Sequence, residues 1–167
     1  VDSQNYGGQQ TFTDGSGNPV QANLGASVVV GNGVRNDGVI SIGNGSLTVQ
    51  SSFTGAGDYQ NGGITVGNQG GNGNLTISTG GVVNARGLQV GNGTGSIGQT
   101  FVYDGAVATI TGTSATPYQG IRIGEDGGAG SINVNNGSKL TSEGGAGFFQ
   151  IGNQATGQLN CSGSDVI

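Results

Sequence analysis

The stretch GGNGN at residues 70–74 has a composition shared by three kinds of loop. Such a loop can cradle a phosphate with its N–H groups, begin a calcium-binding nonapeptide repeat, or form the bend of a coil. The calcium repeat needs a carboxylate at the next position, where this chain has Leu75, and Ile132 follows the equivalent GGAGS. Because an apolar side chain cannot bind a hard cation, the sequence favours a bend and predicts no metal at this loop.

The run GTGSIG at residues 93–98 matches the G-x-G-x-x-G spacing of dinucleotide-binding loops. That spacing binds a pyrophosphate only where it opens a helix whose first N–H groups meet the phosphates. The residues that follow, QTFVYDGAV, are typical of a strand. We therefore interpret 93–98 as another bend and predict no cofactor.

Acid–base chemistry on a sugar requires two carboxylates that face each other across the scissile bond. The chain has nine acidic and four basic residues, mostly scattered among glycine-rich turns. Charges of both signs cluster only where Arg122 precedes Glu125 and Asp126, and we interpret this trio as a local salt link. We predict no catalytic residues and no metal site, hence a protein that is not an enzyme. Three further acids could bind calcium weakly at the surface. We interpret them as solvated turn carboxylates: Asp14, Asp37 and Asp58.

Histidine is absent and cysteine occurs once, so neither a serine-histidine triad nor a familiar zinc ligand set can be assembled. The single cysteine, Cys161, occupies the repeat position that Ile77 and Val134 fill elsewhere. This position predicts a small buried hydrophobic side chain rather than a reactive thiol.

Tyrosine rings could form a sugar-binding surface, because flat aromatic faces stack on pyranose rings. Tyr103 alternates with Phe101, a pattern that favours the core for both. Tyr59 and Tyr118 lie in the two longest insertions, FTGAGDYQNGG and GTSATPYQG. We predict that any contact surface lies on these loops, since binding residues concentrate on loops.

The overall composition excludes several classes of protein. With a net charge of −5, the chain has no basic stripe for a nucleic acid backbone. It also has no apolar run near the roughly 18 residues of a membrane span. Glycine accounts for 39 of 167 residues, but only 8% of residues are charged and short runs of Val, Ile and Leu recur. This combination indicates many short strands rather than disorder.

A repeat becomes visible when the chain is aligned on an apolar residue followed by glycine and usually asparagine. The anchor glycines lie 24 to 36 residues apart, so the unit tolerates insertions. Each anchor is followed by an alternating apolar pair and, in most units, by a third apolar position, which reads as strand, bend, strand, bend, strand. The anchors are Gly31, Gly67, Gly91, Gly124 and Gly152; the pairs are Ile40 and Ile42, Leu75 and Ile77, Phe101 and Tyr103, Ile132 and Val134, Leu159 and Cys161; the third positions are Leu47 and Val49, Val83, Val107, Leu140 and Val166.

A single unit of this kind cannot bury its apolar side chains, but stacked units can. Each strand then pairs in parallel with its equivalent in the next coil, about 4.8 Å away. The sequence thus predicts an all-β solenoid of about five irregular coils with essentially no helix. Residues 28–167 form the solenoid, and residues 1–27, with alternating candidates at Tyr6, Thr11 and Phe12, form an irregular first coil or N-terminal cap.

The segment VGNQGGNGNLTISTGGVVNARGLQVG at 66–91 resembles the strand-loop-strand repeats of autotransporter passenger regions, also seen in PEP-CTERM-associated repeat proteins of Gram-negative bacteria. The family pattern VGxxGxGxLxIxxGGxV is matched at nearly every fixed position there, and more loosely over roughly residues 28–167. The resemblance implies a right-handed parallel β-helix that is secreted or displayed at the cell surface. It implies roles in adhesion, aggregation or matrix formation, and it carries over no catalytic residue.

The sequence therefore predicts a non-enzymatic structural or adhesive module of a bacterial surface adhesin or extracellular matrix fibre, such as that of a biofilm. The alternative is a carbohydrate-binding or carbohydrate-active β-helix, similar to polysaccharide lyases or hydrolases. The partners we expect are a surface glycan or host ligand, and a second copy that stacks end to end, 6–13 against 159–167, to give a homo-oligomer or filament. Because residue 167 falls in mid-unit, we expect either a fragment or an end that another subunit completes.

Overall fold

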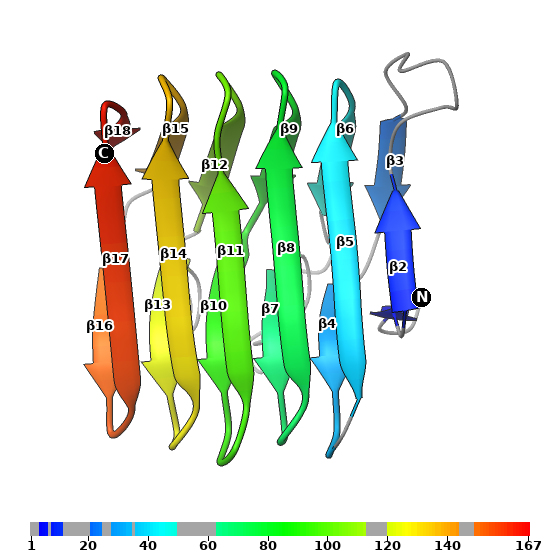
Figure 1. Cartoon of the computed structure of the whole chain (residues 1–167), viewed down its shortest axis with the longest axis vertical. Coiled ribbons are helices and arrows are strands. Elements are labelled where there is room, and N and C mark those ends of the chain that lie inside the picture. The colour runs from blue at the N-terminus through cyan, green and yellow to red at the C-terminus, as the bar shows by residue number, and fades with distance from the viewer. Residues whose placement is uncertain are drawn as a thin grey trace.

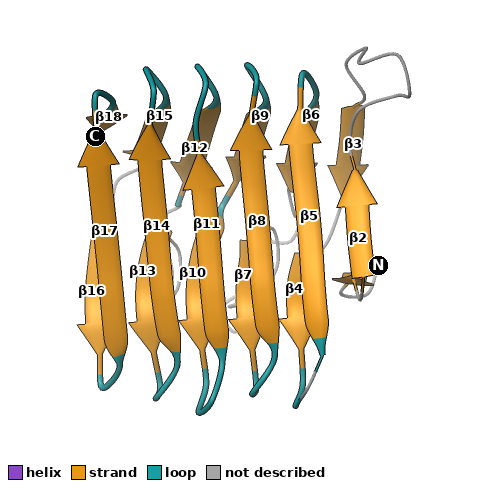
Figure 2. Cartoon of the chain, in the orientation of Figure 1, coloured by secondary structure: helices purple, strands orange, loops and turns teal. Residues whose placement is uncertain are grey.

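A computed structural model describes the chain over residues 4–6, 8–11, 21–24, 28–34, 36–49, 63–112, 120–143 and 149–167, with side chains from residue 28 onward. Eighteen strands and no helix occur in these ranges (Figure 2). The prediction of an all-β chain is confirmed.

The strands form three parallel sheets of six strands each, and every third strand returns to the same sheet. Sheet 1 contains β1 (Gln4–Tyr6), β4 (Val28–Asn32), β7 (Gly63–Asn68), β10 (Gly87–Asn92), β13 (Gly120–Glu125) and β16 (Phe149–Asn153). Sheet 2 contains β2 (Gly8–Thr11), β5 (Asp37–Gly43), β8 (Asn72–Ser78), β11 (Ile97–Val102), β14 (Ala129–Asn135) and β17 (Thr156–Ser162). Sheet 3 contains β3 (Gln21–Leu24), β6 (Ser46–Val49), β9 (Val82–Ala85), β12 (Val107–Thr111), β15 (Lys139–Glu143) and β18 (Asp165–Val166).

The three sheets wrap around one axis as a β-solenoid. In Figure 1 the strands of sheet 2 rise in the front layer, those of sheets 1 and 3 descend behind them, and successive coils advance from right to left. This sense of advance is that of a right-handed coil, as the resemblance implied. Neighbouring strands are parallel throughout, for example β10 between β7 and β13.

The predicted repeat anchors fall in register. Val66 pairs with Val30 on one side and with Val90 on the other, and Ile123 pairs with Val90 and Ile151. The residue after each anchor glycine is also aligned, from Asn32 through Asn68, Asn92 and Glu125 to Asn153. A unit defined from sequence alone is therefore one physical coil.

Inward-facing side chains form ladders along the axis and make up a single hydrophobic core. On sheet 2, for example, Ile77 lies between Ile42 and Val102 and is fully buried. Each ladder adds apolar contact between coils that no single coil could make alone. The largest fully buried side chains are Ile40, Ile42, Leu47, Ile64, Leu75, Ile77, Leu88, Ile110, Ile121, Ile123, Ile132 and Leu140.

The unit with anchor Gly91 differs from the sequence prediction by one residue. Phe101 and Tyr103 were predicted to lie in the core, but the inward positions of β11 are Thr100 and Val102. Thr100 pairs with Leu75 and Ile132, and Val102 with Ile77 and Val134. The prediction was wrong because it followed the bulkier side chains instead of the register.

The same shift occurs on sheet 3. Val107 was predicted to point inward, whereas Ala108 occupies the core position between Val83 and Leu140 and is fully buried. Val107 lies on the outer face and is half-buried. A small side chain fills the core at this level of the stack.

A tight arc joins sheet 1 to sheet 2, and it explains the anchor glycines. Gly91 has φ +75°, and a Cβ atom added to it would lie 2.1 Å from the carbonyl oxygen of Ala129 in the next coil. On the facing strand, a Cβ atom added to Gly98 would lie 2.3 Å from the nitrogen of Gly91. Backbones approach so closely at this arc that a side chain cannot fit.

The glycine-rich motifs lie in this arc, as predicted. In GGNGN, Gly70 ends a turn with Gln69, both with positive φ, and Asn72 already begins β8. In GTGSIG, residues 93–96 form the turn and Ile97 begins β11. A strand, and not a helix, follows each motif, so neither has the helix N-terminus of a nucleotide loop.

The chain turns from sheet 2 to sheet 3 through two residues that both have positive φ. Thr79 and Gly80, with φ +51° and +71°, are an example, and Asp104-Gly105 and Asn136-Gly137 occupy the same place in later coils. Two successive positive φ angles are the signature of a type I′ turn, for which asparagine, aspartate and glycine are favoured. Threonine is an unfavourable choice there.

The first coil continues the three sheets. β1, β2 and β3 pair in parallel with β4, β5 and β6, and Tyr6 takes the register position next to Val30. Thr11 pairs with Ser41, while Phe12 lies outside the described residues. The division of the chain at residues 27 and 28 stays a prediction.

Candidate functional site

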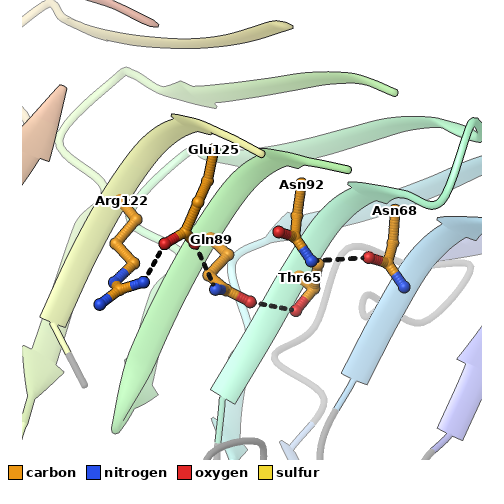
Figure 3. A network of polar contacts seen from close by, with 6 residues as sticks. All are labelled: Thr65, Asn68, Gln89, Asn92, Arg122 and Glu125. Carbon is orange, nitrogen blue, oxygen red and sulfur yellow. Dashed lines mark hydrogen bonds and ion pairs between the residues drawn. The ribbon is translucent and has the colours of Figure 1, made fainter. Parts of the chain in front are cut away.

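A ladder of asparagine side chains runs along the corner where sheet 1 ends. Asn68 donates from Nδ2 to Oδ1 of Asn32 at 2.9 Å. Asn92 donates in the same way to Asn68 at 2.8 Å (Figure 3). Each amide thus links one coil to the next, which is the arrangement of stacked amides in parallel in-register sheets. The predicted ladder is confirmed for these three coils.

Glu125 interrupts this ladder in the fourth unit and turns to a different set of partners. Its carboxylate forms an ion pair with Arg122, which lies on the same strand, and accepts a hydrogen bond from Nε2 of Gln89 at 2.8 Å (Figure 3). Gln89 in turn accepts from Oγ1 of Thr65 at 3.3 Å. A polar network therefore crosses three neighbouring strands of sheet 1, namely β7, β10 and β13.

The charged pair in this network is buried although it lies on the outer side of sheet 1. Arg122 and Glu125 are each only 5% exposed. A charge taken out of water is tolerated only when it is paired and hydrogen-bonded, and both conditions hold for Glu125. Because its two oxygens are held by fixed donors, this carboxylate is suited to linking coils.

The predicted salt link is confirmed for two of its three residues, Arg122 and Glu125. Asp126 follows Glu125 in an exposed turn with φ +50°. Its backbone oxygen accepts a hydrogen bond from Oγ1 of Thr94 at 3.5 Å. The alternation of strand and turn separates the two adjacent acids.

Exposed carboxylates elsewhere also link neighbouring coils, although Asp37 begins β5 and does not lie in a turn as predicted. Asn72 donates to Oδ1 of Asp37 at 2.8 Å, and Asn136 donates to Oδ1 of Asp104 at 3.1 Å. Within the described ranges, no group of three or more His, Cys, Asp or Glu residues is placed to hold a metal ion. Asp14 and Asp58 lie outside those ranges.

The outer face of sheet 2 carries the aromatic residues that the sequence pattern had placed inside. Phe101 lies between Thr76 of β8 and Asn133 of β14, and its side chain is half-buried. Tyr103 follows directly, is also half-buried, and donates its N–H to the oxygen of Ile77 at 3.0 Å. Ile97, which is 50% exposed, and Phe101 lie on the outer face of β11, and Tyr103 follows directly after this strand; we call these three residues the β11 stripe.

The C-terminal coil presents core positions that no described coil covers. Ile151 is in register with Ile123 but is 47% exposed, and Leu159 is only partly buried. Cys161 takes the position next to Val134, as the alignment predicted, but the expectation that it is buried was wrong. Its thiol is exposed and contacts the oxygen of Ser164 at 3.1 Å.

The tyrosines chosen as the candidate contact surface, Tyr59 and Tyr118, lie outside the described residues, between β6 and β7 and between β12 and β13 in the sequence. The anchor glycines are placed in the arc between sheets 1 and 2, where their role is to allow close backbone approach. Sequence reasoning missed the outward position of Phe101 and the part of Gln89 in the buried network. An alignment on Gly73 and Gly98, instead of on bulky residues, would have revealed that Phe101 lies on the outer face.

No family model matches this chain, and no curated protein or solved structure matches it. Among the described residues, no helix is long and apolar enough to cross a membrane.

Proposed function

We propose that this chain is a non-enzymatic structural and adhesive module at the outer surface of a bacterium or in its extracellular matrix, and that its copies associate end to end. Two features support the proposal. The segment 66–91 resembles repeats of autotransporter passenger regions, and the stacked-coil architecture is one that grows by adding coils.

The observation that carries the proposal is the stack of equivalent coils and its last described member. Among the described strands, β16, β17 and β18 stand at one end of the three sheets, and no described strand pairs with their outer edges. Apolar side chains lie beside these edges, with Phe149 37%, Ile151 47% and Ile167 65% exposed. An open strand edge next to exposed apolar side chains is a template for another strand.

The occupant that fits this face is the first coil of a second copy. Among the described strands, β1, β2 and β3 stand at the opposite end of the same three sheets, and all strands of each sheet are parallel. Stacking in the existing register would bring Tyr6 next to Ile151 and Gln10 next to Leu159, so residue 6 would face β16 and not the segment 159–167 to which the sequence analysis assigned it. A contact between two different ends does not close on itself, so it would generate a filament.

Light scattering and electron microscopy of the purified chain, over a range of concentrations, test this proposal. We expect the mass to rise with concentration, and the single thiol, Cys161, to become protected from maleimide as the end coil is covered. Ile151→Asp should abolish both effects. Ile97→Asp is the matched control, because Ile97 is exposed to a similar degree but lies on the side of the solenoid.

Particles that stay monomeric at every concentration, with a thiol that is always reactive, would overturn end-to-end association. Equal effects of Ile151→Asp and Ile97→Asp would show that the copies associate through their sides instead.

A further inference from the structure

On the outer face of sheet 2, the strands on either side of β11 carry mostly uncharged polar side chains, and the carboxylate of Asp37 on β5 borders them through its hydrogen bond from Asn72. In Figure 1 this sheet is the front layer, and no described element lies over it. Asn160 donates to Oδ1 of Asn133 at 2.8 Å, and Oγ1 of Thr76 donates to Oδ1 of Asn74 at 3.1 Å. The outward positions beside β11 are Asn72, Asn74, Thr76 and Ser78 on β8, and Ala129, Ser131, Asn133 and Asn135 on β14.

The β11 stripe breaks this polar surface at one level of the stack. Ile97, Phe101 and Tyr103 follow one another on the outer face, with Gln99 between the first two. The six residues of β11 together span about 20 Å, since each residue of a strand rises about 3.3 Å. The surface therefore offers an elongated apolar strip with amides and hydroxyls along both sides.

Next to the β11 stripe, a polar residue occupies a core position that is apolar in the two neighbouring coils. Thr100 is fully buried between Leu75 and Ile132, and its Oγ1 has no hydrogen-bond partner among the described residues. A slip of one residue would bury Phe101 and expose Thr100, but Gly98, locked in the arc, prevents it. A buried hydroxyl without a partner costs stability, and the two aromatic rings keep part of their surface in water. A local conflict of this kind is expected at functional sites.

We propose that the β11 stripe and its polar margins bind an uncharged polysaccharide chain laid along the strand. Flat aromatic faces pack against the C–H faces of pyranose rings, while amides and hydroxyls exchange hydrogen bonds with sugar hydroxyls. The outward positions of β8, β11 and β14 carry no charged side chain, which favours a neutral glycan over a uronate or a phosphate-bearing polymer. The inference deepens the adhesive role proposed above by giving it a ligand class.

The test is retention of the purified chain by neutral polysaccharides, with amorphous cellulose, xylan, mannan and a mixed-linkage β-glucan as probes and polygalacturonate as the charged comparison. We expect at least one neutral polymer to bind. The double variant Phe101→Ala with Tyr103→Ala should weaken that binding by about ten-fold or more, which corresponds to about 1.4 kcal/mol. Its melting temperature should stay near that of the unmodified chain, because both rings lie outside the core.

A second pair of variants separates stacking from simple hydrophobic contact. Phe101→Leu with Tyr103→Leu keeps an apolar stripe but removes the flat rings, so binding should fall nearly as far as in the alanine variant. Phe101→Trp should retain binding or strengthen it. Ile151→Asp should bind the glycan normally, because the C-terminal coil is not part of this surface. This variant therefore distinguishes a failure of end-to-end association from a failure of glycan binding.

Three results would overturn the proposal. One is retention by polygalacturonate alone or by none of the polymers. Another is binding that the alanine and leucine variants leave unchanged. The third concerns the double variant Phe101→Ala with Tyr103→Ala: it would lose concentration-dependent light scattering and still bind glycan. That result would identify the outer face of sheet 2 as a contact between copies.

Discussion

Replacing Gly98 with alanine tests the idea that close backbone approach at the arc sets the register of the coil. An ideal Cβ atom at Gly98 would lie 2.1 Å from the oxygen of Val66, 2.3 Å from the nitrogen of Gly91 and 2.9 Å from the carbonyl carbon of Val90. All three atoms belong to the backbones of β7 and β10, which are paired with each other. No flexible side chain is available to move aside.

The size of the effect follows from what must move. Overpacking a core of side chains typically costs about 1–3 kcal/mol. Here the backbone itself must shift and weaken the parallel hydrogen bonds, so we expect Gly98→Ala to lower the free energy of unfolding by about 3 kcal/mol or more. Gly105→Ala is the matched control: nothing lies within 4 Å of its added Cβ, but its φ is +73°. Its cost should be limited to the left-handed backbone, about 1–2 kcal/mol.

Urea unfolding followed by far-ultraviolet circular dichroism measures both variants against the unmodified chain. Because stacked repeats can unfold in more than one step, the midpoint and the slope of each transition should be compared together. If Gly98→Ala proves no more harmful than Gly105→Ala, the arc can relax, and it does not fix the register of β11.

Three further substitutions address single positions by the same measurement. Thr100→Val should stabilise the chain by about 1 kcal/mol, since it removes a buried hydroxyl that lacks a partner among the described residues; a loss of stability would mean that the hydroxyl is satisfied. Thr79→Asn should also stabilise by about 1 kcal/mol, because Thr79 has φ +51° and the equivalent turn position of a later coil is Asn136; an unchanged midpoint would contradict this. Glu125→Gln should destabilise by about 3 kcal/mol, because it leaves the buried charge of Arg122 without its counter-charge, and a neutral result would show that the pair contributes nothing.

Several features of the fold could be read directly from the sequence. The recurrence of an apolar residue, glycine and asparagine predicted which residues would lie in register, and Asn68 indeed lies between Asn32 and Asn92. The bends were equally predictable, since glycine supplies the positive φ and the close approach that they require, as at Gly91. These signals are local, and each coil repeats them.

The inward and outward positions of β11 were also encoded, but in a weaker signal. Counting from the arc glycine, Gly73-Asn-Leu-Thr-Ile aligns with Gly98-Gln-Thr-Phe-Val, which places Thr100 and Val102 inside. Hydrophobicity alone favoured Phe101. The backbone constraint at the glycine prevails because a strand cannot slip by one residue without breaking the arc.

Other features depend on the stacked structure and on nothing local. Gln89 and Glu125 are 36 residues apart and meet only because their strands are neighbours in sheet 1, so the buried charge network could not be seen in the sequence. Cys161 and Ile151 occupy core positions by every sequence criterion, yet they are exposed in the last described coil, because the neighbouring coils supply burial in a solenoid. The sequence by itself thus determined the coil, its bends and its repeating unit, through backbone geometry that acts within a few residues. Only the tertiary structure decided which side chains meet across coils and which are covered, because those contacts form between segments that stacking brings together.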